Sequence, residues 1–387
     1  MTKNKERRPS RRLSVREKEN AARQIGIALT ALFALAGAVL LTAALLTAGL
    51  GALTGGGSPL GGLFGTSLPT LARQATAGDG KKTQDADTAP FEDEPGDVLP
   101  GEETPGTDEP ADGINKITPR DYSIAAAPTV KNKTSYDIDT DALLAMASDV
   151  ETPAEIYAQY GKTAPIVLIV HTHGTECYRA EEQTESRAGD HFRSDDPLRS
   201  IVSVGDVLAE VLVKAGINTM HCTVMFDKDS YSDAYDASGK VVRELVEKYP
   251  SIRYVIDVHR DALTGNGNNY AAVTEIDGVP YAQFLMVIGT DEGGAKHPRW
   301  KNCLSAAMKL QVALAEDYPG VARSISLRRP SFNAQYAPIS LLFEFGTCAN
   351  TLREAKRTAV LVGEKLAELI AGEPCPVSTD EILARFA

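Results

Sequence analysis

The segment from residue 25 to residue 53 constrains this chain most, because it runs for 29 positions without a charged side chain. At a rise of about 1.5 Å per residue, a helix of this length exceeds the roughly 30 Å core of a bilayer. A cleavable signal peptide has a shorter apolar region of about 7–15 residues. We therefore expect a transmembrane signal anchor over 25–53, in preference to a cleaved signal or a buried helix.

The charges on either side of this segment predict its orientation. Residues 1–24 contain nine Lys/Arg and three Glu, whereas the thirty residues after the segment contain only Arg73, Lys81 and Lys82 as basic side chains. An excess of basic residues marks the cytoplasmic side. We therefore expect a basic cytoplasmic tail over 1–24, a single pass through the cytoplasmic membrane and an extracytoplasmic C-terminal part.

Residues 54–121 are predicted to form a disordered acidic linker. Eleven Asp/Glu and no basic residue lie between Lys82 and Lys116, and such a segment cannot bury enough apolar surface to offset its ordering entropy. Nine basic minus three acidic residues give the tail about +6, so the formal net charge of −12 leaves about −18 on the rest of the chain. This acidity argues against nucleic acid as a partner, because binding phosphates needs a basic face.

Residues 122–387 alternate short apolar runs with longer amphipathic ones, which is typical of an α/β domain. We predict a mostly parallel central sheet flanked by helices. The expected strands lie at 166–170, 219–225, 253–258 and 339–345, with a hairpin of 270–276 and 281–288 around Asp277-Gly278. The expected helices lie at 198–215, 240–249, 301–317 and 351–371, and the last one begins at a Thr351/Glu354 capping box.

Four reactive side chains fall at the carboxyl ends of predicted strands. His171 and His173 follow 166–170, His259 follows 255–258, and Glu344 lies near the end of 339–345. Because the carboxyl ends of parallel strands meet at one edge, we expect these side chains to lie close together. Imidazole nitrogens and a carboxylate bind zinc and leave a position for water, and a further carboxylate can move the proton to a leaving amine. The pattern therefore predicts a zinc-dependent amide hydrolase.

The other candidate residues carry weaker signals. His191, His221 and His297 lie in loops or alternating segments and are assigned structural roles. Cys177 offers a rival cysteine nucleophile, but no Gly-rich elbow or helix N-terminus presents its thiol. The five cysteines show no CxxC spacing, so they predict no zinc ribbon.

Several separated motifs resemble the stage II sporulation protein P family, in the order in which that family has them. The motifs are 165–178 (PIVLIVHTHGTECY), 204–206 (VGD), 249–252 (YPSI), 257–261 (DVHRD), 342–346 (LFEFG) and 350–355 (NTLREA). The resemblance covers roughly 136–371, and the anchor and acidic spacer also suit the family. More distantly, the strand-end histidines and final glutamate are similar to those of the zinc-dependent N-acetylmuramoyl-L-alanine amidases.

The resemblance implies a peptidoglycan hydrolase that acts in engulfment during sporulation. It implies cleavage of the amide between N-acetylmuramic acid and L-alanine, endopeptidase action on peptide cross-links, a Zn²⁺ cofactor, and the sporulation proteins D and M of the engulfment machinery as partners. Carried over by motif, the metal ligands are His173 or His171, then Glu176 and His259, and Glu344 is catalytic. We favour His173 over His171 because it lies far enough into the loop to turn inward.

Three assignments keep alternatives. The third ligand is Glu176 or, as in wall amidases whose carboxylate ligand opens the first helix, Asp195 or Asp196. Arg260 is expected to bind a stem-peptide carboxylate or to form a salt bridge with Asp261 or Asp257. The family's Tyr-Asn-Gln stretch is Phe332-Asn333-Ala334-Gln335 here, which places Asn333 among the substrate-binding residues. The alternative to an enzyme is a non-catalytic wall-binding scaffold on a membrane tether.

Overall fold

The computed structural model of the protein describes residues 113–386. The predicted cytoplasmic tail (1–24) and signal anchor (25–53) lie outside the described residues, and so does the predicted linker up to residue 112. Within 113–386, no helix has the length and apolar character that crossing a membrane requires.

The central sheet has seven strands, and its inner strands carry the candidate site. In spatial order they are β2 (Val130–Asn132), β11 (Ile325–Arg328), β10 (Phe284–Gly289), β12 (Ile339–Thr347), β6 (Tyr254–Asp261), β3 (Val167–Val170) and β5 (Thr219–His221). The strands β12, β6, β3 and β5 run parallel to one another, whereas β10 runs antiparallel to β12.

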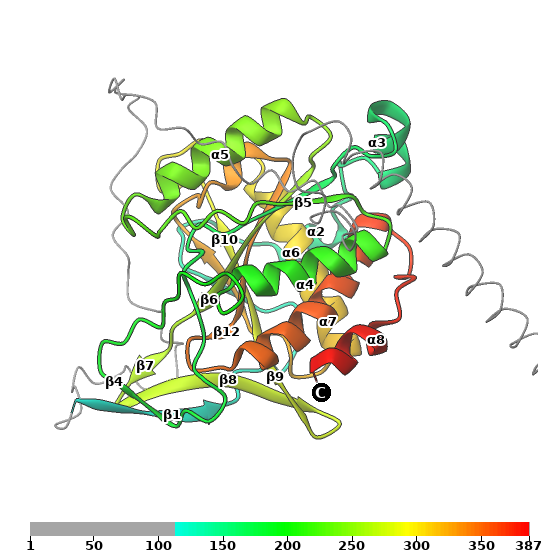
Figure 1. Cartoon of the computed structure of the whole chain (residues 1–387). Helices are drawn as coiled ribbons and strands as arrows, with labels where there is room; N and C mark the ends of the chain where they lie inside the picture. Colours follow the sequence, from blue (N-terminus) through cyan, green and yellow to red (C-terminus); the bar gives the residue numbers. More distant parts are fainter. Residues whose placement is uncertain (1–112, 387) are drawn as a thin grey trace, which may run out of the picture. The chain divides into compact units, whose positions relative to one another are not determined.

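A second, smaller sheet lies below the central strands in the view of Figure 1. Its strands are β4 (Glu185–Arg187), β1 (Ile114–Arg120), β8 (Asn268–Ile276) and β7 (Thr264–Gly265), with β9 (Val279–Ala282) paired to β8. Only β1 and β8 are parallel here, and the other pairs are antiparallel. The α/β class is therefore confirmed, but the sheets are mixed rather than the mostly parallel sheet that we predicted.

Two predicted boundaries differ because the deciding contacts are distant in sequence. Strand β1 lies inside the predicted linker (54–121), where it pairs with β8 and β4. The predicted strand 281–288 is two strands in different sheets, divided at Gln283. The buried amide of Gln283 accepts from the Tyr122 N–H (2.7 Å) and donates to the Gly320 carbonyl (2.8 Å), so this residue joins the two sheets to neighbouring loops.

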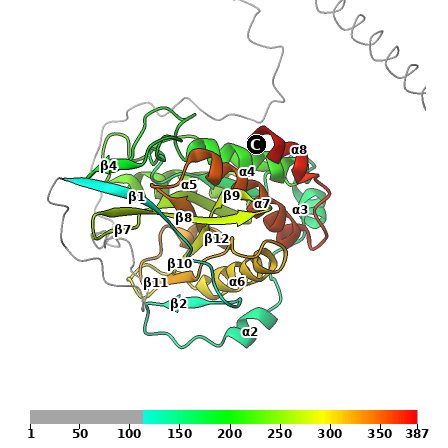
Figure 2. The ribbon, with the colours of Figure 1, turned by 90° about the horizontal axis from the view of Figure 1, so that it is seen from below.

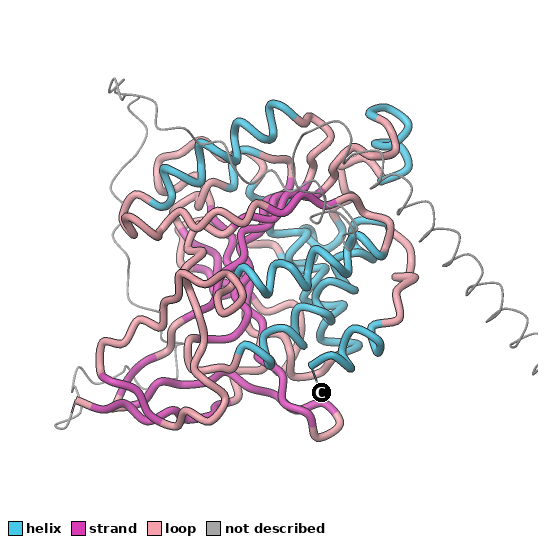
Figure 3. The backbone as a smooth tube through the Cα atoms, in the orientation of Figure 1, coloured by secondary structure: helices cyan, strands magenta, loops and turns pink. Residues whose placement is uncertain are grey.

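Helices cover both faces of the central sheet, with α4, α6 and α7 on one face and α5 on the other (Figures 1 and 3). Figure 2 shows α2 beside α6 at one edge. The helices are α2 (Thr140–Ala145), α3 (Pro153–Tyr160), α4 (Val202–Lys214), α5 (Ala234–Lys248), α6 (Trp300–Asp317), α7 (Leu352–Ala371) and α8 (Thr379–Leu383), with the 3₁₀ turns η1 (Ala334–Tyr336) and η2 (Ala384–Phe386). The predicted helix at 198–215 begins only at Val202, because Asp196 and Pro197 open a turn that precedes it.

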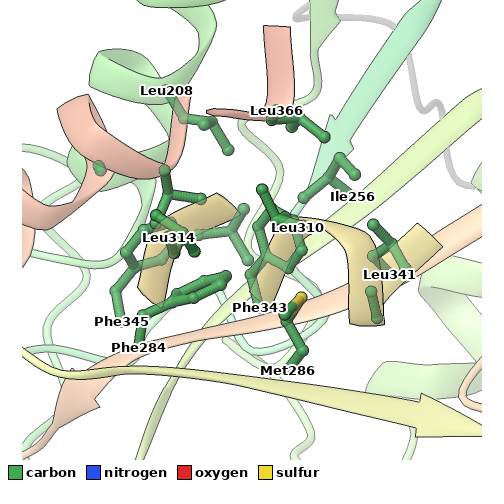
Figure 4. Packing of buried hydrophobic residues seen from close by; sticks show 14 of the residues in the cluster. Leu208, Ile256, Phe284, Met286, Leu310, Leu314, Leu341, Phe343, Phe345 and Leu366 are labelled. Carbon is green, nitrogen blue, oxygen red and sulfur yellow. The ribbon is translucent and has the colours of Figure 1, made fainter. Parts of the chain in front are cut away.

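The main core lies between the sheet and the α4, α6 and α7 layer (Figure 4). Phe343 and Phe345 of β12 pack there with Phe284, and the rings of Phe284 and Phe343 meet edge to face with centroids 4.9 Å apart. Side chains alternate between the two faces of a strand. Glu344, between the two phenylalanines, is therefore directed to the opposite face, which α5 covers.

Candidate active site

The candidate site lies on the α5 face of the central sheet, at the carboxyl ends of β3, β6 and β12. Glu344 of β12 is the register partner of His259 of the parallel neighbour β6, and side chains of such partners lie side by side on one face. Both strands extend further than predicted, to Thr347 and Asp261, so these two residues lie inside strands rather than beyond them. The sequence prediction that they meet at one sheet edge is consistent with this pairing.

The loop that follows β3 brings the remaining predicted metal residues to His259. The His173 and His259 rings meet edge to face with centroids 5.4 Å apart. His259 Nδ1 lies 3.5 Å from Glu176 Oε2, which also accepts the backbone N–H of Arg260 at 3.0 Å. All three side chains are buried. The structure thus gathers His173, Glu176 and His259 into one cluster.

Charge within this cluster shifts the titration of its members. Burial opposes ionisation of Glu176, but Arg260 and His259 together lower the pKa of its carboxyl to about 2. Burial likewise opposes charging of His259, yet Asp257 and Glu176 raise its pKa well above the ordinary value. Burial lowers the pKa of His173 to about 4. The cluster therefore holds an ionised Glu176 beside a neutral His173 at neutral pH.

The pKa of the Glu344 carboxyl is shifted in the opposite direction from that of Glu176. Burial, with only partial compensation by His259, raises the pKa of its carboxyl to about 8. Its Oε2 atom is buried without a hydrogen-bond partner. A partly buried carboxyl whose pKa lies near neutrality can both accept and donate a proton, which is the property expected of a general acid or base.

His171 lies apart from this cluster because both of its ring nitrogens are engaged elsewhere. Its Nδ1 lies 3.1 Å from the Val258 carbonyl oxygen, and its Nε2 lies 2.8 Å from Nε2 of His221. His221 in turn pairs with Asp206 at 3.1 Å. This placement favours His173 over His171 as a ligand, and it gives His221 the structural role that we predicted.

The two alternative carboxylate ligands, Asp195 and Asp196, form contacts away from the cluster. Asp195 pairs with Lys228 at 3.3 Å on the surface, and Asp196 accepts the backbone N–H of Leu198 at 3.0 Å in the turn before α4. Glu176 is therefore the carboxylate that the fold places beside the two histidines.

The two predicted substrate-binding residues, Arg260 and Asn333, form hydrogen bonds within the protein. Arg260 is buried, donates to the carbonyl oxygens of Cys177 (3.1 Å) and His191 (2.7 Å), and lies 3.7 Å from Glu176. The Asn333 amide donates to the Tyr235 carbonyl at 2.8 Å, which ties the loop before η1 to α5. These contacts give both side chains a structural role, and substrate binding by either of them stays a prediction. The ion pair of Arg260 is with Glu176 rather than with Asp261 or Asp257.

The rival cysteine mechanism finds no support in the surroundings of Cys177. Burial raises the pKa of this thiol, whereas a nucleophilic cysteine needs its pKa lowered. All five cysteines are free thiols, and none of them forms a disulfide.

The cluster can be tested for its fit to zinc. Among residues 113–386, no group of three or more His, Cys, Asp or Glu side chains is arranged so that it could hold a metal ion. The donor types nevertheless suit zinc, and the 3.5 Å between His259 Nδ1 and Glu176 Oε2 is close to the roughly 3.3 Å between two ligands of one tetrahedral zinc with bonds of about 2.0–2.1 Å. The donor types and this one spacing suit zinc, although the side chains as placed do not form a metal-binding group.

Sequence reasoning missed three side chains that border the cluster. Tyr231 stacks on His173 with ring centroids 4.2 Å apart. Asp227 Oδ2 lies 3.9 Å from His173 Nδ1, and Asp257 Oδ1 lies 3.0 Å from His259 Nε2. Asp257 was visible two residues before His259 on the same strand face. Asp227 and Tyr231 lie in the loop between β5 and α5, where no local pattern marks them.

Comparisons with known proteins identify relatives of this chain. Stage II sporulation protein P of Bacillus subtilis (strain 168) is 27% identical over 217 residues, which cover 53% of this chain and 51% of that protein. The chain thus spans about half the length of this curated relative.

Two solved structures show a distant likeness. The amidase AmiC2 of Nostoc punctiforme has 14% identity and a TM-score of 0.32, covering 54% of this chain and 96% of that chain. The CwlD amidase of Clostridioides difficile, in complex with the GerS lipoprotein, has 12% identity and a TM-score of 0.33, covering 57% and 100%. These likenesses are too distant to be used for function.

The family comparison covers most of the chain. Residues 73–371 match the family described as stage II sporulation protein P (SpoIIP), and this range contains His173, Glu176, His259 and Glu344. The chain therefore belongs to the stage II sporulation protein P family.

Proposed function

We propose that this protein is a zinc-dependent peptidoglycan hydrolase of sporulation that cleaves the amide between N-acetylmuramic acid and L-alanine, with endopeptidase action on peptide cross-links. Membership of the stage II sporulation protein P family supports the process and the substrate. The observation that carries the chemistry is the register pairing of Glu344 with His259, which lies beside Glu176 and His173.

His173, Glu176 and His259 are the residues that would hold the metal. When bound, zinc supplies a Lewis acid for the scissile carbonyl and lowers the pKa of a water molecule. The Arg260 backbone N–H and guanidinium keep Glu176 ionised and in place. The buried surroundings of these side chains exclude bulk water and strengthen their electrostatic effect on a bound substrate.

Glu344 is the residue that we assign to proton transfer. It takes the proton of the attacking water and delivers it to the leaving amine as the carbon–nitrogen bond breaks. Its pKa of about 8 suits both halves of this transfer near neutral pH. No side chain of the protein needs to form a covalent intermediate in this scheme.

We further propose that the hydrolase acts outside the cytoplasm, held to the cytoplasmic membrane by the segment 25–53, with the sporulation proteins D and M as partners. The apolar segment and its flanking charges support the anchor and its orientation. Peptidoglycan lies on the side of the membrane where this orientation places the domain.

Two measurements on the purified chain test this proposal. Elemental analysis gives its zinc content, and mass spectrometry detects the fragments that it releases from defined peptidoglycan. We expect about one zinc per wild-type chain, loss of zinc in His259→Ala, and loss of fragment release with folding and wall binding retained in Glu344→Gln. The exposed His191 provides a control, because His191→Ala should keep both properties.

Two outcomes would contradict the proposal. A folded His259→Ala protein with stoichiometric zinc and full fragment release would remove the site. A wild-type protein that binds cell walls but releases no fragment under any metal condition would favour the non-catalytic scaffold.

A further inference from the structure

Two threonine–aspartate pairs flank His173 in the loop after β3. Thr172 donates its backbone N–H (2.9 Å) and its hydroxyl (2.6 Å) to the carboxylate of Asp257. Thr175 donates the same two groups (3.0 Å and 2.5 Å) to the carboxylate of Asp227. The two aspartates come from β6 and from the loop after β5, so the loop that carries His173 is fixed at both ends by buried charge-assisted hydrogen bonds.

Asp257 also faces the second histidine of the site. Its Oδ1 atom lies 3.0 Å from His259 Nε2, and both residues project from the same face of β6. The other ring nitrogen, Nδ1, lies 3.5 Å from Glu176. Asp257 thus lies beside Nε2 of His259, whereas Nδ1 of the same ring faces the Glu176 carboxylate.

Asp227 lies on the Nδ1 side of His173, at a longer distance than that between Asp257 and His259. Its Oδ2 atom lies 3.9 Å from His173 Nδ1, a buried nitrogen without a hydrogen-bond partner. Arg193 pairs with Asp227 at 2.5 Å, and its guanidinium carbon lies 4.4 Å from the centre of the Tyr231 ring. Tyr231 stacks on the His173 ring at an angle of 15°. This arrangement holds the face of the imidazole and places a carboxylate on the side of its Nδ1 atom.

We propose that Asp227 and Asp257 are positioning residues, one for each histidine of the site, and that each sets which ring nitrogen is presented to a metal. The inference rests on the proposed function. Carboxylates that hold the distal nitrogen of a metal-binding histidine fix its tautomer and orientation and increase its affinity. The threonine bonds add a second effect, because the same two carboxylates hold the loop on which His173 lies.

The test measures zinc affinity of the full chain by competition with a chelator, independently of activity. We expect Asp227→Asn and Asp257→Asn to weaken zinc binding by about 10–100-fold. The surface residue Asp195, which pairs with Lys228, gives the matched control, because Asp195→Asn should keep the wild-type affinity. Circular dichroism of each variant establishes that it is folded.

A second measurement separates positioning from simple loop support. Nitrogen-15 NMR of the metal-free protein reports which nitrogen of His173 carries the proton. We expect the proton on Nδ1 in the wild type and a shift toward Nε2 in Asp227→Asn. Thr175→Val removes one bond from the loop but leaves the carboxylate beside Nδ1, so its tautomer should stay as in the wild type. If Asp257→Asn fails to fold, Thr172→Val takes its place, because it removes a hydrogen bond to the Asp257 carboxylate. We expect the Thr172→Val protein to bind zinc less than tenfold more weakly than the wild type.

The outcomes distinguish this inference from the function on which it rests. Zinc bound by the wild type and by both aspartate variants with equal affinity, with the His173 tautomer unchanged, would overturn the positioning roles and leave the zinc site intact. A folded wild-type chain that binds no zinc would overturn the metal site, and the positioning roles with it.

Discussion

At the scale of single residues, His297 links the stability of the fold to pH. Its side chain is buried in the loop between β10 and α6, and its Nε2 atom has no hydrogen-bond partner. Burial lowers its pKa to about 4, with Arg299 acting in the same direction and Asp291 in the opposite one. Between pH 6.5 and 4 the unfolded chain binds this proton and the folded chain does not, so the free energy of unfolding falls as the pH falls through that window.

Replacing His297 by leucine should remove this dependence. We expect the wild type to lose about 1–3 kcal/mol more than His297→Leu between pH 7 and pH 4.5. Urea unfolding at the two pH values measures the difference. The exposed His191 is the control, and His191→Leu should follow the wild type. Parallel pH profiles for wild type and His297→Leu would contradict the prediction.

The same scale shows how far sequence alone locates a site. His173, Glu176, His259 and Glu344 were predicted because each lies at or near the end of an apolar strand, and strand ends are visible in a sequence. Asp227 was not predicted, because its role depends on Thr175, Arg193 and His173 meeting it in space. The internal hydrogen bonds of Arg260 were not predicted for a similar reason, since only the fold shows that its guanidinium is enclosed by carbonyl groups of the loop over 177–192.

At the scale of elements, two helices begin with the same capping box in different surroundings. In α7 the Thr351 hydroxyl accepts the Glu354 N–H (3.2 Å) while Glu354 accepts the Thr351 N–H (3.1 Å), and both residues are buried. In α3 Thr152 and Glu155 form the equivalent pair on the surface. Because α7 packs across the main core, the loss of its cap should lower the free energy of unfolding of the whole domain.

We therefore expect Thr351→Ala to lower the free energy of unfolding by about 1–2 kcal/mol, and Thr152→Ala by less than about 0.5 kcal/mol. Urea unfolding of the two variants beside the wild type measures both values. Equal effects of the two substitutions would show that burial of the cap is irrelevant.

Elements with a strong local pattern were predicted well, and those held by distant partners were not. The strand 166–170 and the helices 301–317 and 351–371 match β3, α6 and α7 closely, because their periodicity and caps are local signals. Strand β1 has the sequence INKITPR, in which no face is consistently apolar. Its structure comes from pairing with β8 and β4, which a reading of the linker composition could not reveal.

At the scale of the whole molecule, the position of β1 moves the start of the domain. The strand is paired on both sides, through five register pairs with β8 and three with β4, so it is internal to its sheet. A chain that began at residue 122, where we predicted the domain to start, would leave unpaired N–H and C=O groups along β8 and β4. The folded unit must therefore include residues 114–120.

This boundary is tested with three chains that begin at residues 73, 113 and 122. We expect the first two to unfold at the same urea concentration, because both contain β1. The chain from 122 should be less stable by about 2–4 kcal/mol, since it loses the ladder hydrogen bonds of β1, each worth about 0.5–1.5 kcal/mol net, partly offset by the ordering entropy of the strand. It should also aggregate more readily through the exposed edges. If the chains from 113 and 122 unfolded together, β1 would contribute nothing to the stability of the domain, and the boundary at residue 122 would stand.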